Sequence, residues 1–206
     1  MIVGMMLLVR LTFAISFCLA MPLASQASDV TKSSRSVDAE AMDAVGSESR
    51  LDTLFTALAG ARSEGEANSL AGRINRELVH SESATISLLM ERAIMAINAR
   101  DYPLALDLLD SVILLSPNYV EAWNKRATVY FLQDELNLAL NDIEQTLRLE
   151  PRHYGALLGF GMIMQKFDEK AVALKVFRKV LEIYPHNSTA QQRVDSLSKE
   201  VEGVPL

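Results

Sequence analysis

Hydrophobic residues recur at helical spacing along most of the chain beyond residue 50. Within residues 120–132, one helical face carries Trp123, Ala127, Tyr130 and Phe131. After the polar sequence QDELN, a second stripe follows at the same kind of spacing: Leu136, Ala139, Leu140, Ile143 and Leu147. The pattern predicts two amphipathic helices joined by a short turn, each burying one face against the other.

The pair of stripes returns at a fixed interval. Pro117, Pro151 and Pro185 stand 34 residues apart. Small residues keep the same step in two sets: Ala93, Ala127 and Gly161, and Ala105, Ala139 and Ala173. Proline ends the second helix of each unit because its ring and missing N–H are incompatible with a continuing helix. Small residues let two helix backbones approach closely, so the period predicts stacked helical hairpins.

These positions resemble the tetratricopeptide repeat (TPR). The unit 120–153 matches the family pattern at Trp123, Ala127, Tyr130, Ala139 and Pro151, and the units 86–119 and 154–187 match it at most of the same positions. The turn glycine common in the family is replaced by Arg100, Asp134 and Asp168. The resemblance implies an all-α solenoid of antiparallel helix hairpins that forms a right-handed superhelix.

The predicted helical domain, residues 51–203, has a different kind of element at each end. Residues 51–85 carry apolar or small residues at several positions of the pattern but Ser83 in place of the proline. We interpret them as a degenerate hairpin that caps the first repeat. At the other end, residues 188–203 form one apolar stripe that predicts a single helix covering the last repeat: Ala190, Val194, Leu197 and Val201.

The first 50 residues have a different composition. An apolar run of 14 residues, Leu11 to Ala24, follows Arg10. It is shorter than the roughly 20 residues of a membrane-spanning helix, so residues 1–27 are predicted to be a signal peptide cleaved after Ala27. The serine-rich residues 28–50 are predicted to be a flexible polar linker. We therefore expect a periplasmic or secreted protein whose mature form does not insert into a membrane; the alternative is an uncleaved N-terminal anchor.

Charge and cysteine content exclude several classes of function. The formal net charge is −6, and removal of the signal peptide takes away one arginine and no acid, which gives −7. An acidic chain has no general attraction for phosphate backbones, so nucleic acid is not an expected partner. The single cysteine, Cys18, lies in the predicted signal peptide. The mature chain is therefore expected to have no disulfide and no cysteine metal ligand.

No pattern typical of catalysis is present, so we predict a protein that is not an enzyme and has no catalytic, cofactor or metal site. His153 and His186 follow prolines and are interpreted as surface turn residues, because no second ligand stands at zinc spacing. Four acidic residues are expected on solvated outer helix faces: Asp107, Asp110, Asp142 and Glu144. The sequence NST at Asn187 fits either a glycosylation site or the start of a helix.

The expected function follows from the resemblance, which implies that the first helix of each unit lines a concave groove. The predicted partner-binding residues are Met90, Ile94, Ile97, Asn124, Thr128, Phe131, Leu132, Leu158, Met162 and Gln165. Family members that hold a C-terminal carboxylate use basic and amide residues there, whereas this chain has Met90, Ile94, Gly155 and Gly159, so chaperone tails are not expected ligands. We predict a non-enzymatic scaffold that binds a peptide, a helix or a partner protein. The alternative is a self-associating module whose groove is covered by its own N-terminal helices or by a second subunit of a homodimer.

Overall fold

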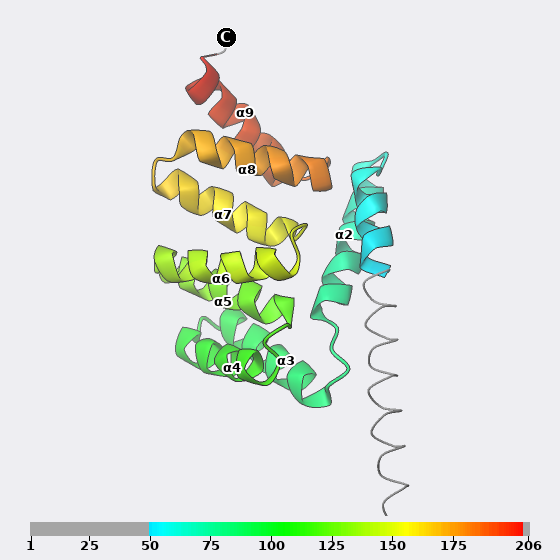
Figure 1. Cartoon of the computed structure of the whole chain (residues 1–206), viewed down its shortest axis with the longest axis vertical. Helices are drawn as coiled ribbons and strands as arrows, with labels where there is room; N and C mark the ends of the chain where they lie inside the picture. Colours follow the sequence, from blue (N-terminus) through cyan, green and yellow to red (C-terminus); the bar gives the residue numbers. More distant parts are fainter. Residues whose placement is uncertain (1–49, 204–206) are drawn as a thin grey trace, which may run out of the picture. The chain divides into compact units, whose positions relative to one another are not determined.

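The computed structural model describes residues 50–203, which form helices joined by short turns (Figure 1). A first helix covers residues 50–59 and is followed by α2 (Glu64–Val79), α3 (Ala84–Asn98), α4 (Tyr102–Leu115), α5 (Val120–Leu132), α6 (Leu136–Leu149), α7 (Tyr154–Lys166), α8 (Lys170–Ile183) and α9 (Ser188–Glu202). These residues contain no strand, so the prediction of an all-α fold is confirmed.

The predicted signal peptide, residues 1–27, lies outside the described residues, as does the predicted linker 28–50 except for Arg50, which begins the first helix. Within the described part of the chain, none of the helices combines the length and the hydropathy that crossing a bilayer requires.

Three helix hairpins stack in sequence order as α3–α4, α5–α6 and α7–α8, and α9 covers the last of them (Figure 1). The two sets of small residues are buried where the helices of each hairpin meet. Leu197 of α9 is buried against α8 beside Ala173 and Phe177. Asn187 caps the start of α9 by accepting a hydrogen bond from the backbone N–H of Ala190 at 2.9 Å, which confirms the helix-start interpretation of this position.

The prolines act as the sequence predicts. Helices α4, α6 and α8 end two residues before Pro117, Pro151 and Pro185. The residues that precede these prolines have left the helical conformation, with φ/ψ of −143°/78° at Ser116 and −136°/95° at Glu150. This is the restriction that a following proline ring imposes on its neighbour.

The turn inside each hairpin uses a left-handed residue without a glycine. Arg100, Asp134 and Asp168 have φ values of 61°, 63° and 60°. A left-handed conformation crowds the Cβ atom against the backbone, at a cost of roughly 1–2 kcal/mol per residue, which aspartate tolerates better than arginine. The turn at Arg100 is therefore the most strained of the three.

Arg100→Gly is expected to raise the free energy of unfolding by about 0.5–1 kcal/mol, because glycine removes the Cβ strain but adds entropy to the unfolded chain. The measurement is urea unfolding followed by circular dichroism. Ala99→Gly is the matched control: Ala99 has φ −78° in the right-handed region, so glycine there should lower stability by up to about 1 kcal/mol. Equal effects of the two substitutions would contradict the assignment of strain to Arg100.

The N-terminal hairpin, which we define as residues 50–79, does not cap the first repeat, so that part of the prediction is wrong. Its buried residues, among them Leu58 and Ile74, share one core cluster with Leu157 of α7 and Val180 of α8. The residues of α3 and α4 form a separate cluster, with no member from the N-terminal hairpin. The hairpin therefore packs beside the stack, and the α3–α4 end of the stack is left without a preceding repeat.

Polar contacts attach α2 to the turns between successive repeats. Tyr119 donates to the carbonyl of Val79 at the end of α2, and Tyr154 donates to Asn75 Oδ1 at 2.8 Å in its middle. Further along the stack, Tyr184 donates to Asn68. These contacts run from the C-terminal end of α2 toward its N-terminal end, so α2 lies across the repeats rather than parallel to their helices (Figure 1).

Candidate partner-binding groove

Helices α5 and α7 form a small cavity on the predicted binding face. Asn124, Thr128 and Phe131 lie at i, i+4 and i+7 on α5, and Leu158 and Met162 lie at i and i+4 on α7, so each set shares one helical face. Together they line a cavity of about 180 Å³. Its other walls are Ala127, Ile143, Gly155, Ala156, Gly159 and Ile163.

Gly159 leaves space in this cavity. A Cβ atom at Gly159 would lie 3.5 Å from Cδ1 of Ile143, one of the wall residues, so any longer side chain here would project into the cavity. Pockets that hold drug-sized molecules have volumes of roughly 300–1,000 Å³. The cavity is smaller than that and mostly apolar, so it suits one apolar side chain of a larger ligand rather than a free small molecule.

Two other predicted groove residues line a different cavity. Met90 and Ile94 of α3 face the C-terminal end of α2 across a space of about 730 Å³, which Val79, His80 and Met95 also line. Met90 is only 1% exposed and belongs to the core of the first repeat. The predicted groove is therefore divided into a cavity between repeats two and three and a cavity beside α2.

The last three predicted groove residues line neither cavity. Ile97 packs half-buried on the core of the first repeat. Leu132 is 51% exposed at the end of α5, and Gln165 is half-buried near the end of α7. The structure thus brings together five of the ten predicted residues at one site.

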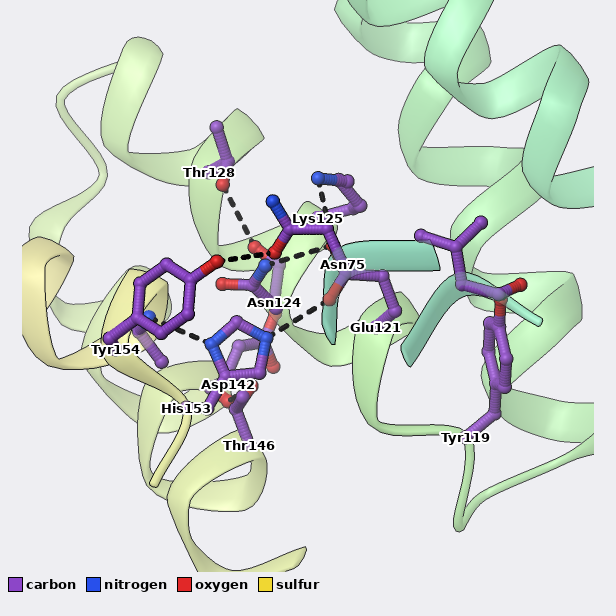
Figure 2. Close-up of polar contacts among 12 residues, drawn as sticks. Asn75, Tyr119, Glu121, Asn124, Lys125, Thr128, Asp142, Thr146, His153 and Tyr154 are labelled. Atoms are coloured by element: carbon purple, nitrogen blue, oxygen red, sulfur yellow. Dashed lines mark hydrogen bonds and ion pairs between the residues drawn. The ribbon is translucent and has the colours of Figure 1, made fainter. Parts of the chain in front are cut away.

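A buried polar network lies beside the smaller cavity, at the start of α5 (Figure 2). Glu121 and His153 are each 5% exposed, and Glu121 Oε2 lies 3.0 Å from His153 Nε2. His153 Nδ1 accepts the backbone N–H of Ala156 at 3.1 Å, so the ring proton must be on Nε2 and is donated to Glu121. The interpretation of His153 as a surface turn residue is wrong: the ring caps α7 and joins it to α5.

The other Glu121 oxygen, Oε1, binds the Lys125 ammonium at 2.8 Å and accepts from the Asn124 side chain at 3.2 Å. Burial alone raises the pKa of Glu121, but the hydrogen bond from His153 and the nearby charge of Lys125 outweigh it and lower the pKa from 4.5 to about 2. Asn124 is a cavity residue, so this network fixes the polar edge of the cavity.

The Glu121 network predicts a specific dependence of stability on pH. Because the folded state lowers the pKa of Glu121, its contribution is complete above the unfolded value of about 4.5 and is lost as the pH falls toward 2. Glu121→Gln should lower the free energy of unfolding by about 2 kcal/mol at pH 7, since hydrogen bonds to a charged group are replaced by neutral ones. The difference from the unsubstituted protein should shrink between pH 4.5 and pH 2 in urea titrations.

The control for this change is Glu144→Gln, because Glu144 is exposed on α6. It should alter stability by less than about 0.5 kcal/mol at either pH. A Glu121→Gln difference that stays constant from neutral to acid pH would contradict the proposed titration.

A second buried charge lies between α5 and α6. Arg126 Nε and Nη2 bind the two oxygens of Asp142, each at 2.8 Å, and Nη1 reaches Asp110 of the preceding repeat at 2.6 Å. The guanidinium carbon also lies 5.0 Å from the centre of the Trp123 ring. Asp142 is 3% exposed, so its interpretation as a solvated carboxylate is wrong.

The other histidine in an inter-repeat turn, His186, also contacts another part of the chain. His186 is half-buried, and its Nε2 lies 3.0 Å from the carbonyl oxygen of Ala61 in the N-terminal hairpin. Residues 50–203 contain no group of three or more His, Cys, Asp or Glu side chains that could hold a metal ion. The polar clusters of this region hold helices together, and the cavity between α5 and α7 is the place where five of the ten predicted groove residues meet.

Two relatives of this chain are named for tetratricopeptide repeats. A TPR repeat-containing protein of Rhizobium etli is 39% identical over 186 residues, which cover 90% of this chain and 91% of that protein. The chloroplastic tetratricopeptide repeat domain-containing protein PYG7 of Arabidopsis thaliana is 26% identical over 136 residues, covering 64% of this chain and 45% of its own length. No family model matches the chain.

Solved structures show the same fold at low sequence identity. The first TPR domain of Spaghetti (RPAP3), bound to the HSP90 peptide SRMEEVD, is 21% identical, with a TM-score of 0.55 over 60% of this chain and 98% of that one. MamA is 18% identical, with a TM-score of 0.54 over 66% of this chain and 80% of that one. Likeness at this level of identity concerns the arrangement of helices and carries no ligand with it.

Proposed function

Because the chain belongs to the tetratricopeptide repeat family, whose members are generally non-enzymatic protein-interaction scaffolds, we propose that it binds a partner protein through the cavity between α5 and α7. The observation that carries the proposal is the convergence of Asn124, Thr128, Phe131, Leu158 and Met162 on one small cavity. Thr128 is exposed, and Phe131, Leu158 and Met162 are half-buried, so a ligand side chain can reach them.

The chemistry of the cavity selects the kind of partner. The ten predicted groove residues include no basic side chain. The RPAP3 domain is bound to the peptide SRMEEVD, which carries acidic residues. The two lysines nearest these residues already have acidic partners, Lys166 with Asp134 and Lys125 with Glu121, so an acidic tail would have to compete for its charge-assisted hydrogen bonds. We therefore propose a partner segment that inserts an aliphatic or aromatic side chain between Phe131 and Met162 and hydrogen-bonds Asn124 or Thr128 at the rim.

Site-specific photocross-linking in living cells tests this proposal. A photoreactive amino acid at Thr128 is expected to capture a partner protein, and the same group at Glu144, which is exposed on α6, is not. Phe131→Glu and Leu158→Glu should each reduce the Thr128 adduct at least ten-fold, because either places a charge in an apolar contact. Circular dichroism of both variants establishes that the repeats remain folded.

Leu138→Glu is the matched control, since Leu138 is 43% exposed on α6 and does not line the cavity. It should leave the Thr128 adduct unchanged. An adduct that survives both cavity substitutions would place binding on another surface. An adduct between two copies of the chain would favour the self-associating alternative over an external partner.

We also propose that the protein works outside the cytoplasm, in the periplasm or after secretion. The support is the apolar run of 14 residues behind Arg10, followed by the small residues of the predicted cleavage site. N-terminal sequencing of protein recovered from the periplasmic fraction should begin at Ser28. Protein that retains the apolar run and fractionates with membranes would support the anchored alternative instead.

A further inference from the structure

The N-terminal end of the repeat stack exposes large apolar side chains. Leu88 and Met95 of α3 are 49% and 63% exposed, and they lie two helical turns apart on the same face. Among residues 50–203, the N-terminal hairpin is the only part of the chain before α3, and its buried residues pack with α7 and α8 instead. In the described part of the chain no hairpin stacks on this face, although Met95 and Glu91 also line the cavity beside the C-terminal end of α2.

The repeat itself shows what this face is suited to. One and two repeats later, the position of Leu88 is occupied by Ala122 and Ala156, which are 0% and 1% exposed. The position of Met95 is occupied by Val129 and Ile163, both 0% exposed. In those repeats the preceding hairpin covers the two positions. In the first repeat the same two positions carry Leu88 and Met95, which no preceding hairpin covers and which are 49% and 63% exposed.

A terminal repeat that ends in water normally has a polar outer face, because stacked repeats otherwise offer an apolar surface for aggregation. The other end of this stack follows that rule. Helix α9 buries Leu197 against α8 and has a polar outer face: Gln191, Gln192, Arg193, Asp195 and Ser196 are exposed. The exposed face of α3 is apolar instead. An apolar face at the end of a repeat stack is expected where another surface covers it in the functional protein.

The charged residues on this face carry both signs. Glu91 and Arg92 are exposed and flank the stripe of Leu88 and Met95 on either side. Arg92 occupies the repeat position of Arg126, which reaches back to Asp110 of the preceding repeat. Arg92 has no preceding repeat, so the acid that would complete this contact must come from whatever covers the face.

We propose that the α3 end of the stack is a homodimer interface, at which two copies meet end to end about a two-fold axis. A second copy supplies what the face requires: Leu88 and Met95 meet the same apolar residues of the partner, and Glu91 lies ready to face Arg92. Helix α4 of the same hairpin also exposes Leu104, Leu114 and Leu115, whereas α9 presents a polar face at the opposite end of the stack. A two-fold contact also closes on itself, so it gives a dimer and not a filament.

Analytical ultracentrifugation of the purified protein from 1 to 100 µM tests the proposal. The unsubstituted protein is expected to sediment as a dimer. The double variant Leu88→Glu, Met95→Glu is expected to sediment as a monomer, with a dissociation constant of the dimer at least 100-fold higher. Both residues are exposed in the single chain, so the melting temperature of the double variant measured at low concentration should not fall. Leu138→Glu, an exposed leucine on α6, is the control and should remain dimeric.

Exchange of the two charges tests the two-fold arrangement itself. Glu91→Arg places two arginines side by side on each copy and should weaken the dimer, whereas Glu91→Arg together with Arg92→Glu should recover most of the loss. If the unsubstituted protein is a monomer at 100 µM, the proposal is overturned. This holds both for an open face and for a face that other residues of the same chain cover. A dimer that resists Leu88→Glu with Met95→Glu, or a mass that keeps growing beyond two copies, would overturn it as well.

Discussion

Asp142→Ala is expected to lower the free energy of unfolding by about 3 kcal/mol, the range found when one partner of a buried ion pair is removed. The substitution takes away both oxygens that Arg126 binds at 2.8 Å. The guanidinium group, with a side chain only 18% exposed, would keep Asp110 as its acidic partner together with its contact with the Trp123 ring. Urea unfolding at neutral pH measures the loss.

The repeat sequence suggests a control for Asp142→Ala and a pair of substitutions that should restore stability. Asp110→Ala removes the partner whose side chain is 56% exposed and should cost less than about 1 kcal/mol. The third repeat has Phe160 and Val176 at the positions of Arg126 and Asp142. Arg126→Phe combined with Asp142→Val should therefore recover most of the stability, because an apolar pair can replace a buried ion pair. A loss for Asp142→Ala no larger than that for Asp110→Ala would refute the buried role of this pair.

Gly161→Val is expected to destabilise the protein by about 3 kcal/mol, at the upper end of the cost of overpacking a core. A Cβ atom at Gly161 would lie 2.6 Å from Cε1 and 2.7 Å from Cζ of Phe177. The Phe177 ring is 0% exposed, so it has no free space into which to move. Separation of α7 from α8 is the remaining way to relieve the contact, and thermal and urea unfolding report its cost.

Gly159→Ala, two residues earlier on α7, is the comparison. Its Cβ atom would make an ordinary contact of 3.5 Å with Ile143, so the better helix propensity of alanine should raise stability by up to about 1 kcal/mol. Phe177→Leu introduced together with Gly161→Val should cost less than the sum of the two single changes. Strict additivity would mean that the two residues do not collide.

Most of the stack was predictable because its positions repeat. The prolines, the buried small residues and the left-handed turns at Arg100, Asp134 and Asp168 each follow from one position counted three times. When the same kind of residue occupies the equivalent position of every repeat, one atypical residue does not hide the pattern. The helices and their stacking order therefore follow from the period alone. Five of the ten predicted groove residues meet at one cavity for the same reason.

The position of the N-terminal hairpin was not predictable from the period. Its contacts join residues far apart in the chain, such as Asn68 with Tyr184 and Ala61 with His186. The tyrosines that make these contacts do not occupy one repeat position, so no column reveals them. Periodicity describes how each repeat meets the next, and it carries no information on an element that crosses several repeats.

The buried charges were missed for a different reason. Asp142 interrupts a column that is otherwise apolar, with Leu108 before it and Val176 after it. A single acid in an apolar column indicates a buried partner, and Arg126 on the neighbouring helix is that partner. The column of Arg126 gives no matching signal, because its preceding member is Arg92. Glu121 and His153 gave no such signal, because glutamate in the first turn of a helix is ordinary on the surface.

The crossing of α2 over three turns changes how the chain can fold. In a linear array of repeats each unit interacts only with its neighbours, so the terminal units open first and the transition broadens. Here a single helix touches the turn before α5 and the turn before α9. Opening the last hairpin therefore also releases a helix that supports the first, which favours one sharp, cooperative transition. The same connection requires closure of a long loop before its contacts form, so its assembly is expected to be a late step that limits the rate.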